Sequence, residues 1–492
     1  VINPDGAAVL VQVRTYYSAD DDPVTDHDDA GPTRFEAGKP VMLFTGVEFP
    51  FQPFPKSIKM DSGTDAVARD RLTLLDMESP TPISPMEKIV FASKVAGRES
   101  ARRVAEAYVR LHPTDLICLS MLARFATPAQ QVEFLQGGLD REPLHIEWHR
   151  FYQNAMSELG RDNALITEYD ARLAKSPNDP VLIYLAGRVQ LDLAKTTAMF
   201  RRAVAGPNPC AYAYYGLGGD ALTNGRFADA VAMARKAGAL QPANLAFLTQ
   251  LNDSLMANGQ YQEALQQLSD FRAVTAEAMS MWSTLREIEL YSAMKQPAAV
   301  QAAVERGIAR ATADAGEPDA ASSAMLRGYA AYFADNTPEY LTLMKGSHSN
   351  GLAVAITEGD VAKADKQCNS DPDSTASDHL LVYLLAAQQG HTAIADAHLQ
   401  QAAALMAKAD YDARCFAAAL QGKSTLAPAE LIRHPLATDE KAIVLTALGM
   451  RDPQERARYF ALARKLNFSL RFPHYFLQSI MKAGQRGIRT TE

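Results

Sequence analysis

An acidic stretch near the start of the chain carries the residues best suited to hold a metal ion. Asp20, Asp22, Asp26 and Asp28 lie in one short run that follows an expected strand. Carboxylate oxygens are the ligands that Ca²⁺ prefers, so this run could wrap a calcium ion. The pattern departs from a calcium-binding loop at Ala30, where the third ligand would stand. A solvated acidic loop is therefore the alternative interpretation.

Two pairs of histidines have a spacing that deserves comparison with zinc sites. His145 and His149 stand four residues apart, which places both on one face of a helix. The order is not that of a zinc protease and no third ligand is evident, so an ordinary helical pair is the favoured interpretation. We interpret His391 and His398 in the same way, because both fall in one expected helix of a repeat.

The cysteines give no sign of a zinc ribbon or a redox motif. They lie far apart and form no CxxC pair: Cys118, Cys210, Cys368 and Cys415. Buried free thiols in helices are the expected state. One or two disulfides are the alternative in an oxidising compartment.

Two glycine motifs resemble nucleotide-binding loops only in part. Gly422 begins a Gly-Lys-Ser-Thr run, but Ala417 stands where the motif needs a glycine and a helix is expected upstream in place of a strand. The glycines of 216–219 lie inside an expected helix, where close helix packing explains them. No serine, cysteine or paired-carboxylate constellation can be placed, so we expect no dedicated active site.

The elements that would position these residues fall into regions of different character. Residues 1–80 are expected to form a small β-rich domain, with strands at 8–16 and 41–49 and shorter ones at 57–60 and 72–75. Four strands hardly stand alone, so this domain would pack on the first repeats or on a partner chain. Three further segments follow along the chain: a proline-rich linker at 81–86, helical repeats at 87–480 and a C-terminal tail at 481–492.

The helical region repeats with a period of 34 residues. One series of bulky residues on the first helix of each unit is Tyr214, Leu248 and Trp282, and one series of small residues on the second helix is Ala230, Ala264 and Ala298. Together with Gly225, Gly259 and Pro242, these residues closely resemble the tetratricopeptide repeat. Small residues let two antiparallel helices approach, and glycine ends the first helix.

The resemblance implies a mainly α fold, a right-handed superhelix of roughly eleven helix pairs. Its register is strong over 211–302, and a looser copy at 379–402 has His379 where the bulky residue belongs. Spacing departs from the period near 114–143 and 305–375, where irregular hairpins are expected. A capping helix is expected after Pro473, because an open-ended stack needs one.

The resemblance also implies a partner-binding surface, formed by the first helix of each repeat on the concave face. Its residues in the two well-registered repeats would be Tyr212, Tyr215, Leu222, Thr249, Asp253 and Met256. Arg150 and Asn154 would take similar places in the looser unit around Trp148. This mixed surface has no regular Lys/Arg clamp, so an extended peptide or a whole protein face is expected rather than an acidic tail.

Composition narrows the function classes. The chain has 49 basic and 57 acidic residues, a net charge of −8, and no long basic cluster, so nucleic acid is not an expected partner. No apolar run is long enough to span a bilayer. The first residue is Val1 and not Met. We therefore expect processing, and favour an exported or periplasmic protein over a cytoplasmic one.

Three functions are compatible with these features. The favoured one is a non-enzymatic interaction scaffold or accessory subunit of a larger assembly, which needs no cofactor. The second is a secreted or surface protein whose β-rich domain binds Ca²⁺ or glycan while the repeats act as a spacer. The third is an enzyme of the α-helical-toroid class, which would need a facing acid and base in one cleft.

Overall fold

The computed structural model describes residues 10–11, 33–34, 85–113, 115–141, 143–275, 280–315, 320–345, 351–372 and 374–486. These residues form 24 helices and one pair of short strands. The chain divides into two compact units. The first comprises 1–156 with 311–319, and the second 157–310 with 320–492. The mainly α, tetratricopeptide-like fold expected from the sequence is thus present in the described part of the chain.

The first unit contains the only strands among the described residues. Strand β1 (Leu10–Val11) pairs antiparallel with β2 (Thr33–Arg34), with Leu10 opposite Arg34 and Val11 opposite Thr33. Strand β1 falls inside the strand expected at 8–16. The strands expected at 41–49, 57–60 and 72–75 lie outside the described residues, as does most of the linker, so a β-rich domain stays a prediction.

Helices of the first unit begin where the proline-rich linker was expected to end. They are α2 (Pro85–Leu111), α3 (Leu116–Phe125), α4 (Pro128–Gln136) and α5 (Ile146–Glu158), the last of which runs into the second unit. Helix α4 starts with a capping box, in which the Thr127 side chain accepts from the backbone N–H of Gln130. The shortness of α3 and α4 fits the irregular hairpin expected at 114–143.

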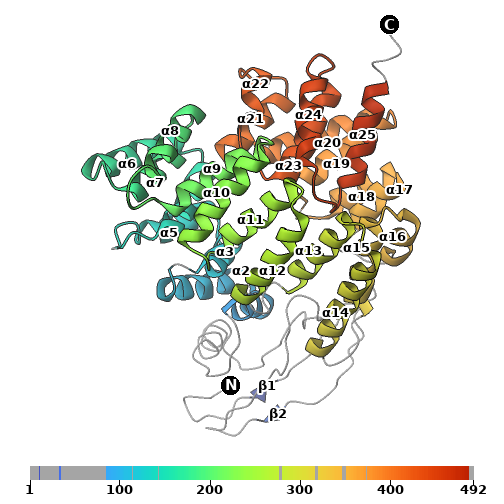
Figure 1. The fold of residues 1–492 in the computed structure, drawn as a ribbon, viewed down its shortest axis with the longest axis horizontal. Coiled ribbons are helices and arrows are strands. Elements are labelled where there is room, and N and C mark those ends of the chain that lie inside the picture. The colour runs from blue at the N-terminus through green and yellow to red at the C-terminus, as the bar shows by residue number, and fades with distance from the viewer. Residues whose placement is uncertain are drawn as a thin grey trace. The chain divides into compact units, whose positions relative to one another are not determined.

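The second unit is a series of helical hairpins (Figure 1). Its first half contains α6 (Asp162–Lys175), α7 (Pro180–Arg188), α8 (Leu193–Ala203), α9 (Ala211–Thr223), α10 (Phe227–Leu240), α11 (Leu245–Ala257), α12 (Tyr261–Thr275), α13 (Ser280–Ala293) and α14 (Pro297–Ala315). Its second half contains α15 (Ala320–Phe333), α16 (Thr337–Met344), α17 (Gly351–Glu358), α18 (Val361–Ser370), α19 (Ala376–Gln388), α20 (Thr392–Met406), α21 (Tyr411–Leu420), α22 (Pro428–Leu431), α23 (Thr438–Arg451), α24 (Arg456–Leu466) and α25 (His474–Arg486).

The 34-residue period is visible in the helix boundaries. Helices α9 and α11 begin at residues 211 and 245, and α10 and α12 at 227 and 261, which are steps of 34 in both cases. The short helices α16, α17 and α18 lie in the stretch 305–375, where the spacing was expected to become irregular.

In the hairpins α9–α10 and α11–α12, the turn between the two helices contains one residue with positive φ. Gly225 (φ 70°) and Gly259 (φ 76°) take this left-handed conformation, which glycine adopts at little cost. The following N–H groups close the turn: Arg226 N bonds Ala221 O at 2.8 Å, and Gln260 N bonds Leu255 O at 2.8 Å. These bonds satisfy carbonyls at the end of the first helix, so the turn geometry is set by local chemistry.

Small residues bring the paired helices together, as the repeat pattern predicted. Ala230, Ala234 and Ala237 of α10 are buried. A methyl group added at Gly216 of α9 would lie 2.5 Å from the ring of Phe200 in α8. The glycines of 216–219 therefore serve close packing inside a helix, as expected.

The C-terminal capping helix is α25, which follows Pro473. It continues to Arg486, so residues 481–486 are helical where a tail was expected. Met481 explains the difference, because it is buried with Leu477 and Ile480 in the same hydrophobic cluster. Across the described residues, no helix combines the length and the apolar character that crossing a membrane requires.

Candidate functional site

Three of the residues predicted to meet a partner belong to the core. Tyr212, Leu222 and Met256 are only 1%, 6% and 2% exposed. The Tyr212 ring lies 4.7 Å from that of Phe247, and its hydroxyl accepts from the Asn244 amide at 2.7 Å. These three residues join neighbouring helices, so the predicted surface is corrected at these positions.

The other predicted residues of this surface are half-buried and hold the helices together. The Tyr215 carbonyl accepts from the Gln250 side chain at 3.0 Å, which links α9 to α11. The Thr249 hydroxyl donates to Leu245 O in its own helix. Asp253 is paired with Arg286 of α13 at 2.5 Å. The structure thus brings Asp253 into a charged network that the sequence pattern did not indicate.

Arg286 is the centre of this network. It is 5% exposed, and besides Asp253 it pairs with Glu289 at 3.0 Å. Glu289 is fully buried and also pairs with Arg471 at 3.3 Å. Two guanidinium groups therefore face two carboxylates, which compensates charges that would be costly to bury alone. The indole ring of Trp282 lies under both arginines, at 5.2 and 5.7 Å from their guanidinium carbons.

Residues 467–475, which comprise the connection from α24 to α25 and the first two residues of α25, contact these helices. Glu289 of α13 accepts hydrogen bonds from the Ser469 hydroxyl and from Leu470 N, the latter at 2.7 Å. The Tyr475 hydroxyl donates to Phe333 O of α15 at 3.0 Å. Helices α13 and α15, which carry none of the predicted partner-binding residues, are thus in contact with the chain's own 467–475 segment.

Burial controls the electrostatics of the network. It raises the pKa of Asp253, and the nearby guanidinium groups of Arg286 and Arg471 oppose that rise. Burial also lowers the pKa of Arg471, together with the like charge of Arg286. The acids of this network, Asp253 and Glu289, are thus paired with arginines and do not form a pair of acids open to a substrate.

The first unit contains a pocket of about 400 Å³ between α2, α4 and α5. Two arginines in its wall have their guanidinium groups over aromatic rings. The Arg110 guanidinium is 4.7 Å from the Phe134 ring, and that of Arg141 is 4.7 Å from the Trp148 ring. Such stacking holds a guanidinium in a fixed orientation while leaving its N–H groups to bind an anion.

The charges around this pocket are only partly paired. Arg102 forms ion pairs with Glu99 and Glu106, and Arg110 lies 3.6 Å from Glu106. No carboxylate among the described residues lies within ion-pair distance of Arg141, whereas Glu133 in the pocket wall is exposed.

Arg150 and Asn154, the remaining predicted partner-binding residues, lie on α5, the helix that carries Trp148. Arg150 is half-buried and Asn154 is exposed. The structure therefore leaves Asn154 accessible on the helix that forms one wall of the pocket.

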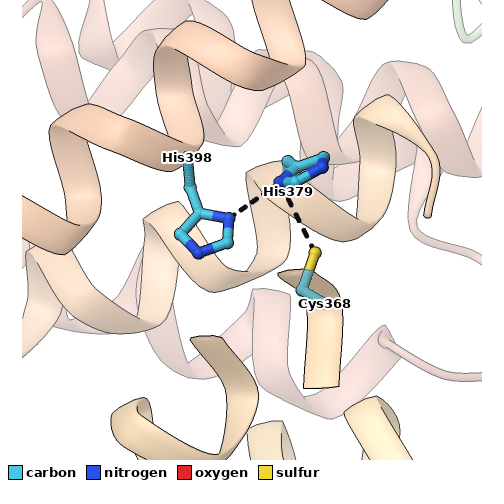
Figure 2. A group of neighbouring side chains, drawn as sticks. All are labelled: Cys368, His379 and His398. Atoms are coloured by element: carbon cyan, nitrogen blue, oxygen red, sulfur yellow. Dashed lines mark hydrogen bonds between the residues drawn. The ribbon is translucent and has the colours of Figure 1, made fainter. Parts of the chain in front are cut away.

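A cluster of metal-binding residue types lies in the second unit (Figure 2). Cys368 of α18, His379 of α19 and His398 of α20 are all buried, and one donor atom from each lies within 4.8 Å of the others. Burial raises the pKa of the Cys368 thiol to about 11. It also lowers the pKa of His379, together with the neighbouring His398. This set was not predicted as a site: Cys368 was expected to be an inert thiol and His398 an ordinary helical histidine.

A signal for this cluster does exist in the sequence. His379 stands at the bulky core position of its repeat, where an apolar or aromatic residue is usual, and His398 lies on the paired helix. A polar residue at a core position needs a partner. The partner on α18 is Cys368, which belongs to the preceding hairpin. The 34-residue period alone does not predict that this hairpin brings Cys368 next to His379.

The other motifs of the sequence do not form sites within the described residues. His149 is fully buried on α5, and within the described ranges no third metal-ligating side chain joins it and His145. Gly422 follows α21 as a turn with φ 70°, so it ends a helix where a phosphate loop would begin one. All four cysteines are free, and Cys415 is the only one that is half-buried rather than buried. Asp20, Asp22, Asp26 and Asp28 lie outside the described residues.

A buried lysine stands apart from these sets. Lys441 of α23 is fully buried, and within the described part of the chain its Nζ has no hydrogen-bond partner. Burial lowers its pKa to about 7, while Asp220 and Asp412 act in the opposite direction. Asp412 itself is bound to His434 at 2.8 Å. Burial thus disfavours the charged form of this lysine more strongly than the two aspartates favour it.

No family model and no curated protein matches the chain. Of three similar solved structures, two are described as containing tetratricopeptide repeats. A tetratricopeptide repeat protein from Parabacteroides merdae is 12% identical, covers 56% of this chain and 97% of its own, and gives a TM-score of 0.29. The P58(IPK) TPR domain is 9% identical over 79% of this chain and 99% of its own, with a TM-score of 0.21.

The third structure is the APC/C hetero-tetramer Cut9-Hcn1, in which the matched chain is 11% identical over 86% of this chain and 90% of its own, with a TM-score of 0.26. Such low TM-scores carry no argument about shape or function. The helices, the glycine turns and the 34-residue period of this chain define its fold class. The fold is a tetratricopeptide-like array of helical hairpins.

Proposed function

We propose that this protein is a non-enzymatic interaction scaffold whose first unit binds an acidic segment of a partner protein in the Arg141 pocket. The observation that carries the proposal is the state of Arg141. Its guanidinium carbon lies over the Trp148 ring, 4.7 Å from the ring centroid, and no carboxylate among the described residues is within ion-pair distance. A carboxylate is the group that binds such a fork of N–H donors most strongly.

The size and composition of the pocket support a peptide ligand. A volume of about 400 Å³ accommodates one or two side chains of a partner. Phe134 and Trp148 supply apolar contact area beside the arginines, and aromatic and arginine side chains dominate the binding energy of protein interfaces. An acidic side chain next to an apolar one would match this wall.

This partner chemistry differs from the sequence-based expectation of a peptide without acidic character. The expectation was drawn from the well-registered repeats, which contain no Lys/Arg clamp. In those repeats three of the residues expected to meet a partner, Tyr212, Leu222 and Met256, are buried. The Arg141 pocket lies in the first unit, where the repeat register was too loose to place side chains.

We also propose that the protein has no catalytic role. The toroid-enzyme alternative needs an acid and a base that face an open cleft. Asp253 and Glu289 meet at Arg286, and both are bound to arginines. We also retain three finer expectations as proposals: a β-rich domain within 1–80, membership of a larger assembly, and export.

Site-specific photo-crosslinking in the native host tests the proposal. A photoreactive amino acid replaces Glu133, which is exposed in the pocket wall, and a second one replaces Glu430, an exposed residue of α22 in the second unit. We expect a discrete crosslinked partner from position 133 that is lost with Arg141→Glu. The same product from position 430, or a product that persists with Arg141→Glu, would contradict the assignment of this pocket.

Purified partner then tests the chemistry. The segment crosslinked at position 133 should contain Asp or Glu, and its affinity should fall as salt is raised, because ion pairs at partly exposed sites are screened. A crosslinked segment without acidic residues would leave the scaffold function standing and remove the proposed ligand class.

A further inference from the structure

The geometry of Cys368, His379 and His398 points to a metal site, and we propose that these three side chains bind one Zn²⁺ or a similar divalent ion. Thiolate sulfur and imidazole nitrogen form the ligand set that zinc prefers. The three residues are 2%, 7% and 1% exposed, and they come from three successive helices of the second unit. Their donor atoms converge on one point, as Figure 2 shows.

Hydrogen bonds alone do not account for both close contacts of His379 in this cluster. Nδ1 of His379 faces Nδ1 of His398 at 2.8 Å and Sγ of Cys368 at 3.5 Å. A ring nitrogen has one in-plane position, which holds either a proton or a lone pair. It can therefore form a straight hydrogen bond with only one of these two neighbours. A single cation between the three atoms would use a lone pair from each.

Asp365 fixes the orientation of one ligand. Its carboxylate lies 2.9 Å from Nε2 of His398. A carboxylate at this position accepts the Nε2 proton and leaves a lone pair on Nδ1, which is the nitrogen that points into the cluster. Metal-binding histidines usually have such a carboxylate or carbonyl on the second nitrogen. We therefore assign Asp365 as a positioning residue and not as a ligand.

The distances are close to those of a zinc site. Zinc bonds of about 2.0 Å to nitrogen and 2.3 Å to sulfur, set at tetrahedral angles, place two ligand atoms roughly 3.3 to 3.6 Å apart. The sulfur to nitrogen distance of 3.5 Å fits this range. The two nitrogens at 2.8 Å would have to separate by about 0.5 Å to reach the tetrahedral spacing.

The position in the fold suggests what the ion would do. Helix α18 belongs to one hairpin, and α19 with α20 form the next. An ion held by all three would cross-link neighbouring repeats. Three protein ligands leave a fourth position for water. The inference is independent of the proposed partner binding, because the Arg141 pocket belongs to the other unit.

Cobalt titration of the full chain tests the proposal. Co²⁺ is the probe, added to protein that has been treated with a chelator and a reductant. We expect one Co²⁺ per chain, with a thiolate-to-cobalt charge-transfer band and the visible bands of a four-coordinate ion, all removed by added Zn²⁺. No charge-transfer band in the wild type would overturn the site.

Four variants assign the ligands. Cys368→Ser should abolish the charge-transfer band, and His398→Gln should weaken Co²⁺ binding at least tenfold. Asp365→Asn should keep the band and weaken binding about 10 to 100-fold, because it alters the ligand only indirectly. Cys415→Ser is the matched control and should behave as the wild type. A band that persists in Cys368→Ser, or is lost in Cys415→Ser, would contradict the assignment.

X-ray absorption of the zinc-loaded wild type covers the case in which a variant fails to fold. The expected first shell contains one sulfur at about 2.3 Å and two imidazole nitrogens at about 2.0 Å. A shell of oxygen and nitrogen without sulfur would place the ion elsewhere, for example on the acidic stretch at 20–29, and would refute the cluster as the binding site.

Discussion

Arg471 and Glu289 form an ion pair of 3.3 Å that joins the connection before α25 to the middle of α13. Glu289 is fully buried and at the same time pairs with Arg286. One carboxylate thus links two arginines from segments far apart in the sequence. This acid helps to hold residues 467–475 on the helices of earlier repeats, together with the contacts of Phe472 and Tyr475 with Tyr332.

The first prediction concerns Glu289→Gln. The change keeps the size of the side chain and an acceptor for Leu470 N. It removes the carboxylate that pairs with both Arg286 and Arg471, and among the described residues it leaves half-buried Asp253 as the acid paired with Arg286. Breaking a buried ion pair from one side usually costs about 3 to 5 kcal/mol. Urea unfolding should show a loss of this size.

Glu263→Gln is the control for this measurement. Glu263 also pairs with an arginine, Arg235, but both side chains are about half exposed. Exposed pairs contribute roughly 0 to 1 kcal/mol. Equal losses in the two variants would mean that the buried network does not hold the 467–475 segment as described.

The second prediction compares two glycines inside helices of one repeat. An alanine methyl at Gly216 would meet the Phe200 ring at 2.5 Å, whereas at Gly238 it would meet nothing within 4 Å. Gly216→Ala should therefore destabilise by about 1 to 3 kcal/mol through overpacking. Gly238→Ala should stabilise by about 0.5 to 1 kcal/mol through helix propensity. Thermal unfolding of both variants measures the signs, and a stabilising Gly216→Ala would contradict the close approach of α8 and α9.

The third prediction uses the pH dependence of Lys441. In the folded chain its pKa is lowered to about 7 from an ordinary value of 10.5. Between these two pH values the unfolded chain binds the proton and the folded chain does not. Stability from this group therefore rises with pH across the window, and the full penalty of the buried charge is felt below pH 7.

Lys441→Met removes this penalty. The shift corresponds to on the order of 4 kcal/mol, so the variant should exceed the wild type in unfolding free energy by several kcal/mol at pH 6 and by much less near pH 10. Urea unfolding at a series of pH values gives this difference. Lys408→Met, at an exposed lysine, controls for the loss of one charge. A gain that does not shrink at high pH would show that packing, and not the charge, is responsible.

Local chemistry made the repeat predictable. Gly225 and Gly259 mark turns that need positive φ, and the alanines of α10 and α12 mark close helix contacts, so the period could be found without long-range information. The accessible side of a helix is different, because it depends on how neighbouring hairpins pack. Tyr212 was for this reason placed on a binding surface although it contacts Phe247 in the core.

Contacts between distant segments were beyond the sequence pattern. Nothing near Glu289 indicates that Arg471 will reach it, and nothing near His379 indicates that Cys368 will. In both cases a polar residue stands at a buried position of a helix, which signals that a partner exists without naming it. The identity of the partner follows only from the packing of whole hairpins.

The fourth prediction separates charge from shape in the Arg141 pocket. Arg141→Lys keeps the positive charge but loses the planar group that stacks on Trp148 at 4.7 Å and donates two parallel hydrogen bonds to a carboxylate. Crosslinking from position 133 should fall several-fold in Arg141→Lys and vanish in Arg141→Glu. Neither change should alter the melting temperature by more than a degree or two, since no carboxylate of the described chain pairs with Arg141. If Arg141→Lys crosslinks as strongly as the wild type, the partner senses charge alone and the stacked guanidinium is not what selects it.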